Sequence, residues 1–326
     1  MSTPLPVGVI GVGALGRHHA RHLAGLAEAR LVGVCDTDRE RARAVAAELG
    51  TRAFDELDDL LRAVEAVTVA VPTPAHASVG LRALERGVPV LMEKPLASTI
   101  AEADALIAAA ARGGLQLQVG HIERYNRALR AAEPYLDGPR YLESQRLAPF
   151  QPRGTDVAVV LDLMIHDLDL VLRLTGGAEA TEVRASGLAL LSNHLDLANA
   201  RVEFSNGAVA LATASRVSRE RVRRLRVFQP NGYLSLDLAS GAGEFMRVRS
   251  DWVPGTGQAL TDVVERILLE APEADALGLE LLSFVHAVRG EREVVVSGEE
   301  GRAALALALR VAAAVRPAPL AVPAAG

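Results

Sequence analysis

The chain has 326 residues, half of them hydrophobic and 23% charged, with a formal net charge of −5 at pH 7. This length suggests about two domains, and the small negative charge gives no reason to expect nucleic acid or an anionic membrane as a partner. The single cysteine, Cys35, excludes internal disulfides and metal sites built from several cysteines. We find no signal peptide and no apolar run of about 20 residues, so we expect a cytoplasmic protein.

The first predicted elements are a buried strand at residues 7–10, a glycine turn and a helix. The turn has the pattern G-x-G-x-x-G, with its glycines at Gly11, Gly13 and Gly16. The first glycine permits a tight turn, the second lets the backbone approach a pyrophosphate, and the third lets the helix pack close to the strand. A dinucleotide pyrophosphate would then lie at the helix N-terminus, in the loop that also contains Ala14 and Leu15.

A second predicted strand, residues 29–36, ends in Asp36, 20 residues after Gly16. A carboxylate at this position accepts hydrogen bonds from the adenosine ribose and repels a 2′-phosphate, which favours NAD over NADP. Arg39 lies close in the sequence, and its positive charge could weaken the preference for NAD over NADP. An aspartate that only caps the next helix would explain Asp36 but not the glycines before it.

Strands and helices continue to alternate. Strands are predicted at residues 66–71, 88–93 and 115–120, and helices at 74–87 and 100–113. This pattern predicts an α/β, doubly wound parallel sheet, a Rossmann domain over residues 1–121. Ligands of such sheets bind beyond the carboxyl ends of the strands. The loops "PTPAH" and "EKP" should therefore lie at the cofactor edge, and the second of them contains Lys94, the only lysine of the chain.

The pattern changes after Gly120. Asn206-Gly207 and Asn231-Gly232 each join two alternating runs, and Asn-Gly in this setting is a strong hairpin signal. We therefore predict a largely antiparallel sheet at about residues 180–250. The flanking helices are expected at 159–176, 276–290 and 301–315. Together these elements predict an α+β domain over residues 122–315, followed by a Pro/Ala-rich tail, 316–326, that we expect to be frayed.

One helix of this domain carries a candidate catalytic pair. Asp162 and His166 are spaced i, i+4, and Asp169 continues the same face. A surface ion pair or a satisfied core histidine would give the same spacing. His121, in "GHIERYN", follows a strand at the cofactor edge and is a rival candidate. The histidines without a comparable setting are His18, His19, His22, His194 and His286.

The order of glycine loop, "EKP", "GHIERYN" and "DLMIHDLDL" resembles the glucose–fructose oxidoreductase/inositol dehydrogenase/MocA (Gfo/Idh/MocA) family over nearly the whole chain. The resemblance implies a Rossmann domain and a second domain whose open sheet face forms the contact of a homo-oligomer, a dimer or a tetramer. It also implies that Lys94 contacts the reacting oxygen, that His166 is the base and that Asp162 contacts the substrate. The residues expected to border the cofactor are Pro72, Thr73, His76, Glu93 and Pro95, with the Lys94–Pro95 bond cis.

The implied chemistry is the oxidation of a carbinol, which loses a hydroxyl proton and a hydride. NAD takes the hydride, and a histidine can take the proton. An ammonium beside the oxygen favours the developing alkoxide. Arginine cannot release a proton in this setting because its pKa is too high, which gives a reason for the retained lysine.

The stretches around "GHIERYN" and "DLMIHDLDL" are most similar to the branch of the family that oxidises the 3-hydroxyl of UDP-N-acetylglucosamine. In that interpretation arginines grip the diphosphate and Tyr125 stacks on uracil. The arginines are Arg124, Arg146 and Arg153, and the further predicted substrate contacts are His121 and Asn126. The alternatives are a dehydrogenase of free sugars or inositols and, in another class, a non-catalytic NAD-sensing regulator. The combination of Lys94, Asp162 and His166 argues against the regulator.

Overall fold

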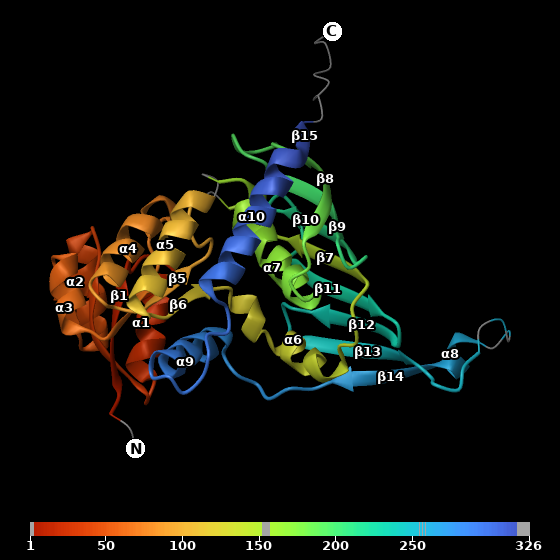
Figure 1. The fold of residues 1–326 in the computed structure, drawn as a ribbon, viewed down its shortest axis with the longest axis horizontal. Coiled ribbons are helices and arrows are strands. Elements are labelled where there is room, and N and C mark those ends of the chain that lie inside the picture. The colour runs from red at the N-terminus through yellow and green to blue at the C-terminus, as the bar shows by residue number, and fades with distance from the viewer. Residues whose placement is uncertain (1–2, 152–156, 254, 256, 258, 318–326) are drawn as a thin grey trace, which may run out of the picture. The chain divides into compact units, whose positions relative to one another are not determined.

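The computed structural model describes residues 3–151, 157–253, 255, 257 and 259–317 (Figure 1). The chain divides into two compact units. The first comprises Met1–Tyr125 and Ala274–Leu305, and the second comprises Asn126–Glu273 and Ala306–Gly326. The domain expected over residues 122–315 is therefore not one unit, because a later segment of it returns to the first unit.

The first unit contains a six-stranded sheet in the order β3-β2-β1-β4-β5-β6, with every neighbouring pair parallel. Its strands are β1 (Leu5–Ile10), β2 (Ala29–Cys35), β3 (Arg52–Phe54), β4 (Ala66–Val69), β5 (Val90–Glu93) and β6 (Leu117–Gly120). Its helices are α1 (Gly16–Gly25), α2 (Arg39–Leu49), α3 (Leu57–Ala63), α4 (His76–Glu85), α5 (Ile100–Gly113) and α9 (Ala276–Val288), with short 3₁₀ turns η1 (Thr73–Ala75) and η2 (Ile122–Tyr125). The predicted doubly wound parallel sheet is confirmed.

Helix α9 completes the core of the first unit. Leu281 and Phe284 of this helix are fully buried in the same apolar cluster as Val7 of β1 and Leu23 of α1. A solvent-facing α1 would expose this cluster, so burial against α9 removes a large apolar area from water. This packing is the physical reason why the late segment belongs to the first unit.

The second unit contains a nine-stranded sheet, within the described residues, in the order β14-β13-β12-β11-β7-β10-β9-β8-β15. Its strands are β7 (Tyr141–Leu147), β8 (Ala180–Leu188), β9 (Leu197–Phe204), β10 (Val209–Ser215), β11 (Val222–Gln229), β12 (Gly232–Asp237), β13 (Ala242–Val248), β14 (Val264–Leu269) and β15 (Val315–Pro317). The β7–β10 and β8–β15 pairs are parallel and the others antiparallel, so a largely antiparallel sheet is confirmed.

Both Asn-Gly hairpins are confirmed. They join β9 to β10 and β11 to β12, and Gly207 has a φ of 81°, a conformation that favours glycine. The sheet is wider than the expected span of residues 180–250, because β7 inserts at its centre and β14 extends its edge. The predicted tail at 316–326 also begins inside strand β15, and residues 318–326 lie outside the described part of the chain.

Two helices of the second unit pack on one face of its sheet, and a third, short helix directly precedes the edge strand β14. They are α6 (Arg127–Ala132), α7 (Ile165–Leu174) and α8 (Leu260–Val263), with a 3₁₀ turn η3 (Glu133–Tyr135) and a π-helical turn, η4 (Val160–Met164). Helix α7 lies against β7 and β10, and α6 lies against β12 and β13 (Figure 1). Helix α10 (Gly298–Ala314) contributes its first residues to the first unit and the others to the second. In the described part of the chain, no helix is both long enough and apolar enough to cross a membrane.

Candidate active site

The glycine loop between β1 and α1 has the geometry of a phosphate cradle. Gly11 has a φ of 81°, and a Cβ there would lie 2.6 Å from the Ala70 carbonyl oxygen. A Cβ on Gly16 would lie 1.8 Å from the Gly11 carbonyl oxygen, so neither position accepts a side chain. A Cβ on Gly13 would meet nothing within 4 Å, so its backbone faces open space. The loop therefore fits the pyrophosphate of a dinucleotide at the start of α1. Ala14 and Leu15 of the same loop are exposed.

Asp36, at the end of β2, is buried and accepts several hydrogen bonds. Its Oδ2 accepts the Val12 N–H at 2.7 Å, and its Oδ1 accepts the Asp38 N–H at 2.9 Å and the Arg41 Nη2–H at 2.7 Å. Burial alone would raise the pKa of Asp36, but the hydrogen bonds from Arg41 and the two backbone groups outweigh it and lower the pKa. Asp36 is therefore ionised at neutral pH. Its partner is Arg41, whereas the predicted Arg39 pairs with Glu56 at 3.2 Å.

Glu93, at the end of β5, joins the glycine-loop helix to the predicted catalytic lysine. Its Oε1 lies 2.9 Å from the His19 Nε2, and its Oε2 accepts the backbone N–H of Lys94 at 3.1 Å. Burial opposes ionisation, but the hydrogen bond from His19 and the positive charge of Lys94 lower the Glu93 pKa. Lys94 is half-buried, and the predicted cis Lys94–Pro95 bond is confirmed.

His76 connects the two predicted cofactor loops. Its Nδ1 lies 2.8 Å from the Pro95 carbonyl oxygen, and its Nε2 lies 2.9 Å from the Val71 carbonyl oxygen. Burial lowers the His76 pKa, so the ring is neutral at pH 7 and carries one N–H. Only one of these two contacts can then be a full hydrogen bond. His76 thus fixes the "EKP" loop beside the loop that contains Pro72 and Thr73.

A second buried acid lies beneath this edge of the sheet. Glu280 of α9 is fully buried, and neither of its carboxyl oxygens has a hydrogen-bond partner within the described residues. Burial, and then the negative charge of Glu93, raise the Glu280 pKa well above its usual range. The pair therefore holds one negative charge, on Glu93, and one proton, on Glu280. The backbone carbonyl of Glu280 contacts Gln118 Nε2 at 3.4 Å.

The "GHIERYN" segment, predicted to contact the substrate, is largely buried in the protein. His121 is fully buried after β6, and Arg124 is buried with its guanidinium 3.1 Å from Glu300. Tyr125 is 8% exposed, and its hydroxyl lies 3.4 Å from Gln118 Nε2, so its ring offers no open face for stacking on uracil. Burial raises the Tyr125 pKa. In the second unit, Asn126 caps α6 by accepting the Ala128 N–H at 3.0 Å.

The predicted pair Asp162 and His166 occupies two kinds of helix in the second unit. Asp162 lies in the π-helical turn η4, and His166 lies, half-buried, in the first turn of α7. π-Helical turns are often found at functional sites. Asp167 was not predicted, and its carboxylate binds the buried Arg146 through two hydrogen bonds, of 3.0 and 2.9 Å. Asp169 is also buried, and the predicted Arg153 lies outside the described residues.

Three residues at this edge of the first unit, His19, Arg41 and Glu280, are not among the predicted site residues. His19 was missed because its partner Glu93 is 74 residues away in the sequence. Glu280 was missed because it lies in the second segment of the unit, whereas Glu93 lies in the first. A local pattern could have indicated Arg41, since it is the third residue of α2 and points back toward the Asp38 cap. Helix-start geometry thus favours Arg41 over Arg39 as the partner of Asp36.

Sequence models of known families match the chain in two places. The model described as the oxidoreductase family with an NAD-binding Rossmann fold matches residues 5–121. The model of the GFO/IDH/MocA C-terminal domain matches residues 134–235. One match falls on the Rossmann sheet and the other on the larger sheet.

Two curated relatives differ in how much of the chain they match. The UDP-N-acetylglucosamine 3-dehydrogenase of Acidithiobacillus ferrooxidans is 43% identical over 309 residues, which are 94% of this chain and 96% of the relative. A solved structure of that enzyme has a TM-score of 0.89 at 42% identity and covers 96% of this chain and 98% of its own. The inositol 2-dehydrogenase of Rubrobacter xylanophilus is 37% identical over 178 residues, 52% of this chain and 51% of the relative.

The buried acid pair gives a testable pH dependence of stability. The folded protein keeps Glu280 protonated, whereas the unfolded chain ionises it near its usual pKa of 4.5. Below pH 4.5 the carboxyl is protonated in both states, and its contribution to the free energy of unfolding is fully present. As the pH rises from 4.5 toward the folded-state pKa, only the unfolded chain loses the proton, so the free energy of unfolding falls by up to about 1.4 kcal/mol per pH unit. Glu280→Gln should remove this loss, so the variant should gain stability over the wild type between about pH 5 and 8 in urea unfolding.

Glu299→Gln, at an exposed position of α10, is the matched control and should keep the wild-type slope. An unchanged slope in Glu280→Gln would contradict a protonated Glu280.

Proposed function

We propose that this chain, which belongs to the Gfo/Idh/MocA family of oxidoreductases, is an NAD-dependent dehydrogenase that oxidises a secondary hydroxyl of a nucleotide sugar to a ketone. The substrate we propose is UDP-N-acetylglucosamine or a close UDP-sugar, reacting at the 3-hydroxyl. The observation that carries this choice is the 43% identity to a UDP-N-acetylglucosamine 3-dehydrogenase over 94% of the chain. The free-sugar alternative is supported by an inositol 2-dehydrogenase that is 37% identical over about half of the chain.

The proposed cofactor preference depends on Asp36. An ionised carboxylate at the end of β2 suits the ribose hydroxyls of NAD and repels the 2′-phosphate of NADP. In the structure Arg41 binds this carboxylate with two nitrogens, at 3.1 and 2.7 Å, and is itself half exposed. Arg41 can therefore turn away when a ribose takes its place. The proposed phosphate contacts are the backbone groups of the glycine loop.

The proposed catalytic roles follow from the setting of each residue. When bound, the nicotinamide ring supplies the acceptor for the hydride. Lys94 is held by its backbone N–H at the end of β5, where its ammonium would stabilise negative charge on the reacting oxygen. In the second unit, His166 would accept the hydroxyl proton and Asp162 would orient the sugar. The proposed roles of Lys94 and His166 rest on the family resemblance and on the chemistry of the two side chains, which belong to different units.

We also propose a homo-oligomer, a dimer or a tetramer, that forms through the sheet face opposite α6 and α7. Tyr141, Phe228 and Tyr233 lie half-buried there, with ring centroids 5.8 and 5.2 Å apart along the row. Such an apolar row on a broad sheet face is typical of a subunit contact.

Light scattering at micromolar concentration should give a multiple of 34.4 kDa, and a particle of 34.4 kDa would contradict the proposed oligomer.

The cofactor preference can be reversed by one substitution. Asp36→Ser keeps an acceptor for the Val12 N–H but removes the Asp36 carboxylate from the Arg41 guanidinium, which keeps its contact with Asp38. A charge-assisted hydrogen bond is worth about 1.5–3 kcal/mol, so binding of NADPH relative to NADH should rise by about 10- to 100-fold in fluorescence titrations. Adding Arg41→Gln should abolish the gain, whereas adding Arg39→Gln should not. Tighter binding of NADPH by the wild type would contradict the role of Asp36.

The substrate assignment is tested by following NADH absorbance with UDP-N-acetylglucosamine, UDP-glucose, free N-acetylglucosamine and inositol. The UDP-sugars should have the higher kcat/KM, by at least about tenfold, because they add charge-assisted contacts that free sugars lack. Higher kcat/KM with a free sugar or inositol would favour the alternative.

Lys94→Arg is the control that separates an enzyme from a sensor. This variant keeps the positive charge but loses the mobile proton, so turnover should fall by about 10²–10⁴-fold while NADH affinity changes little. A sensor would show no turnover in either form. Normal turnover in the variant would mean that the lysine has no chemical role.

A further inference from the structure

The helical segment that contains Asp162 and His166 is held from both sides by buried arginines of the second unit. Asp162 lies in the π-helical turn η4, and His166 lies in the first turn of α7, which follows directly. Turn η4 packs on β10, and α7 packs on β7 and β10, which are parallel neighbours in the sheet. Each strand has a buried arginine at its carboxyl end, Arg146 in β7 and Arg216 directly after β10.

The first contact, named here the Asp167 anchor, lies directly after His166. The Asp167 carboxylate accepts Nε–H and Nη2–H of Arg146 at 3.0 and 2.9 Å, and the two side chains are 2% and 5% exposed. Two parallel hydrogen bonds fix the direction of a carboxylate as well as its distance. Because Asp167 and His166 are adjacent in the chain, the Asp167 anchor fixes the backbone from which the imidazole projects.

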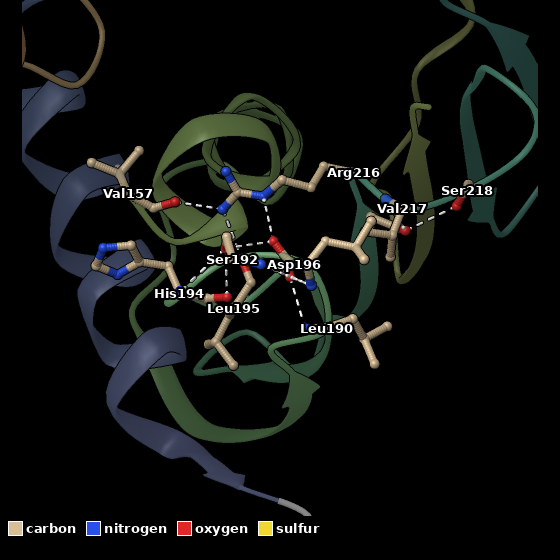
Figure 2. A network of polar contacts seen from close by, with 11 residues as sticks. Val157, Leu190, Ser192, His194, Leu195, Asp196, Arg216, Val217 and Ser218 are labelled. Atoms are coloured by element: carbon tan, nitrogen blue, oxygen red, sulfur yellow. Dashed lines mark hydrogen bonds and ion pairs between the residues drawn. The ribbon is translucent and has the colours of Figure 1, made fainter. Parts of the chain in front are cut away.

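The second contact, named here the Arg216 anchor, lies before Asp162 (Figure 2). Arg216 donates from Nη2 to the carbonyl oxygens of Leu195, at 2.9 Å, and Val157. The same Leu195 carbonyl oxygen accepts the backbone N–H of Val159, the residue before η4, at 2.8 Å. The first N–H groups of a helix have no partner within the helix, so this bond caps the turn that contains Asp162. The Arg216 anchor thus fixes where η4 begins.

Arg216 is itself fixed by Asp196, in the connection between β8 and β9. The Arg216 Nε lies 3.3 Å from the Asp196 Oδ1, and Ser192 Oγ donates to the same oxygen at 2.7 Å. The Asp196 Oδ2 accepts three backbone N–H groups, at 2.7, 2.6 and 3.0 Å, from Leu190, Leu191 and Ser192 (Figure 2). Burial opposes ionisation, but these hydrogen bonds lower the Asp196 pKa to about 2. The acceptor of Arg216 is therefore charged and ordered by its own loop.

Stability alone is a weak reason for two buried ion pairs. The removal of both charges from water offsets most of their attraction, and apolar side chains of similar volume often stabilise a fold as well. Paired hydrogen bonds add a fixed direction, which an apolar contact does not supply. Such precision matters for a proton acceptor, because a displacement of about 1 Å can lower a reaction rate by about 100-fold.

We propose that Arg146 and Arg216 are positioning residues, which hold His166 and Asp162 in the arrangement that the dehydrogenation requires. The inference rests on the proposed function, in which His166 accepts the hydroxyl proton and Asp162 orients the sugar. Arg146 acts through Asp167, and Arg216 acts through the backbone at the start of η4. Both arginines use their donors on protein acceptors, so the proposal requires no free charge on either.

The test uses Arg146→Lys and Arg216→Lys. Lysine keeps the positive charge but cannot reproduce the planar set of donors. In each variant, kcat and kcat/KM for UDP-N-acetylglucosamine should fall together by about 10- to 100-fold, because the loss affects the transition state. The Kd values for NADH and UDP should stay unchanged. With substrate deuterated at the reacting carbon, the isotope effect on kcat should be at least as large as in the wild type, because the slowed step is the chemical one.

Two controls separate positioning from stability. Arg173 of α7 pairs with Glu133 at 2.6 Å, and both side chains are partly exposed. Arg173→Lys is therefore the same change on the same helix, and kcat should match the wild type because exposed ion pairs contribute little. Leu234→Ala removes a fully buried side chain of β12, so it should lower the midpoint of urea unfolding while the folded protein keeps its kcat.

Wild-type kcat in folded Arg146→Lys and Arg216→Lys would overturn the positioning role. Both arginines also line a cavity of about 170 Å³ with Asp162. A raised KM and a raised Kd for UDP with unchanged kcat would therefore indicate direct substrate binding, and would overturn the proposal as well. If a lysine variant misfolds, Asp167→Asn, which keeps the size of the side chain, should show the same fall in kcat.

Failure of the proposed function gives a different result. A wild type that oxidises only a free sugar or inositol would overturn the UDP-sugar assignment, and the same fall in kcat with that substrate would still support both anchors. A wild type without turnover on any sugar would overturn the proposed function and the positioning role with it.

Discussion

The hydrogen bond between His19 and Glu93 is the contact on which the functional edge of the first unit depends. It joins α1, which starts at the glycine loop, to the end of β5, and the second oxygen of the same carboxylate holds the backbone of Lys94. One side chain thereby links the phosphate cradle to the lysine. The carboxylate keeps its charge in a buried setting because Glu280 beside it keeps a proton. Two ionised acids this deeply buried would repel each other strongly.

Much of the fold could be predicted from local patterns. The glycine turn, the alternating strands and helices and both Asn-Gly hairpins depend on neighbours in the sequence, and the structure has all of them. Strand β7 was missed because it pairs with β10 and β11, more than 60 residues later, and its own run, "YLESQRL", is largely polar. The place of α9 was missed for the same reason. The apolar face of α9 could pack against either unit as far as the sequence shows, and it is the packing against α1 that places α9 in the first unit.

The candidate site could be predicted in its motifs but not in its supporting contacts. Gly11, Asp36 and Lys94 stand at strand ends, where the fold class itself indicates ligand contacts. Whether an arginine points at a ligand or into the protein depends on its partner. From the sequence, Arg124 and Arg146 are equally good candidates for phosphate contacts. In the structure both are buried, and Arg124 binds Glu300 while Arg146 binds Asp167.

The divided first unit has a consequence for synthesis of the chain on the ribosome. Residues 274–305 must emerge before α1 can bury its apolar face, and the second unit in turn waits for the residues after 305. Domains usually fold as units, the N-terminal one first, as they leave the ribosome. Here the first sheet emerges early with one side of its core still open to water. A nascent chain stalled before residue 274 would carry that exposed surface, which makes it a substrate for chaperones rather than a free-standing nucleotide-binding domain.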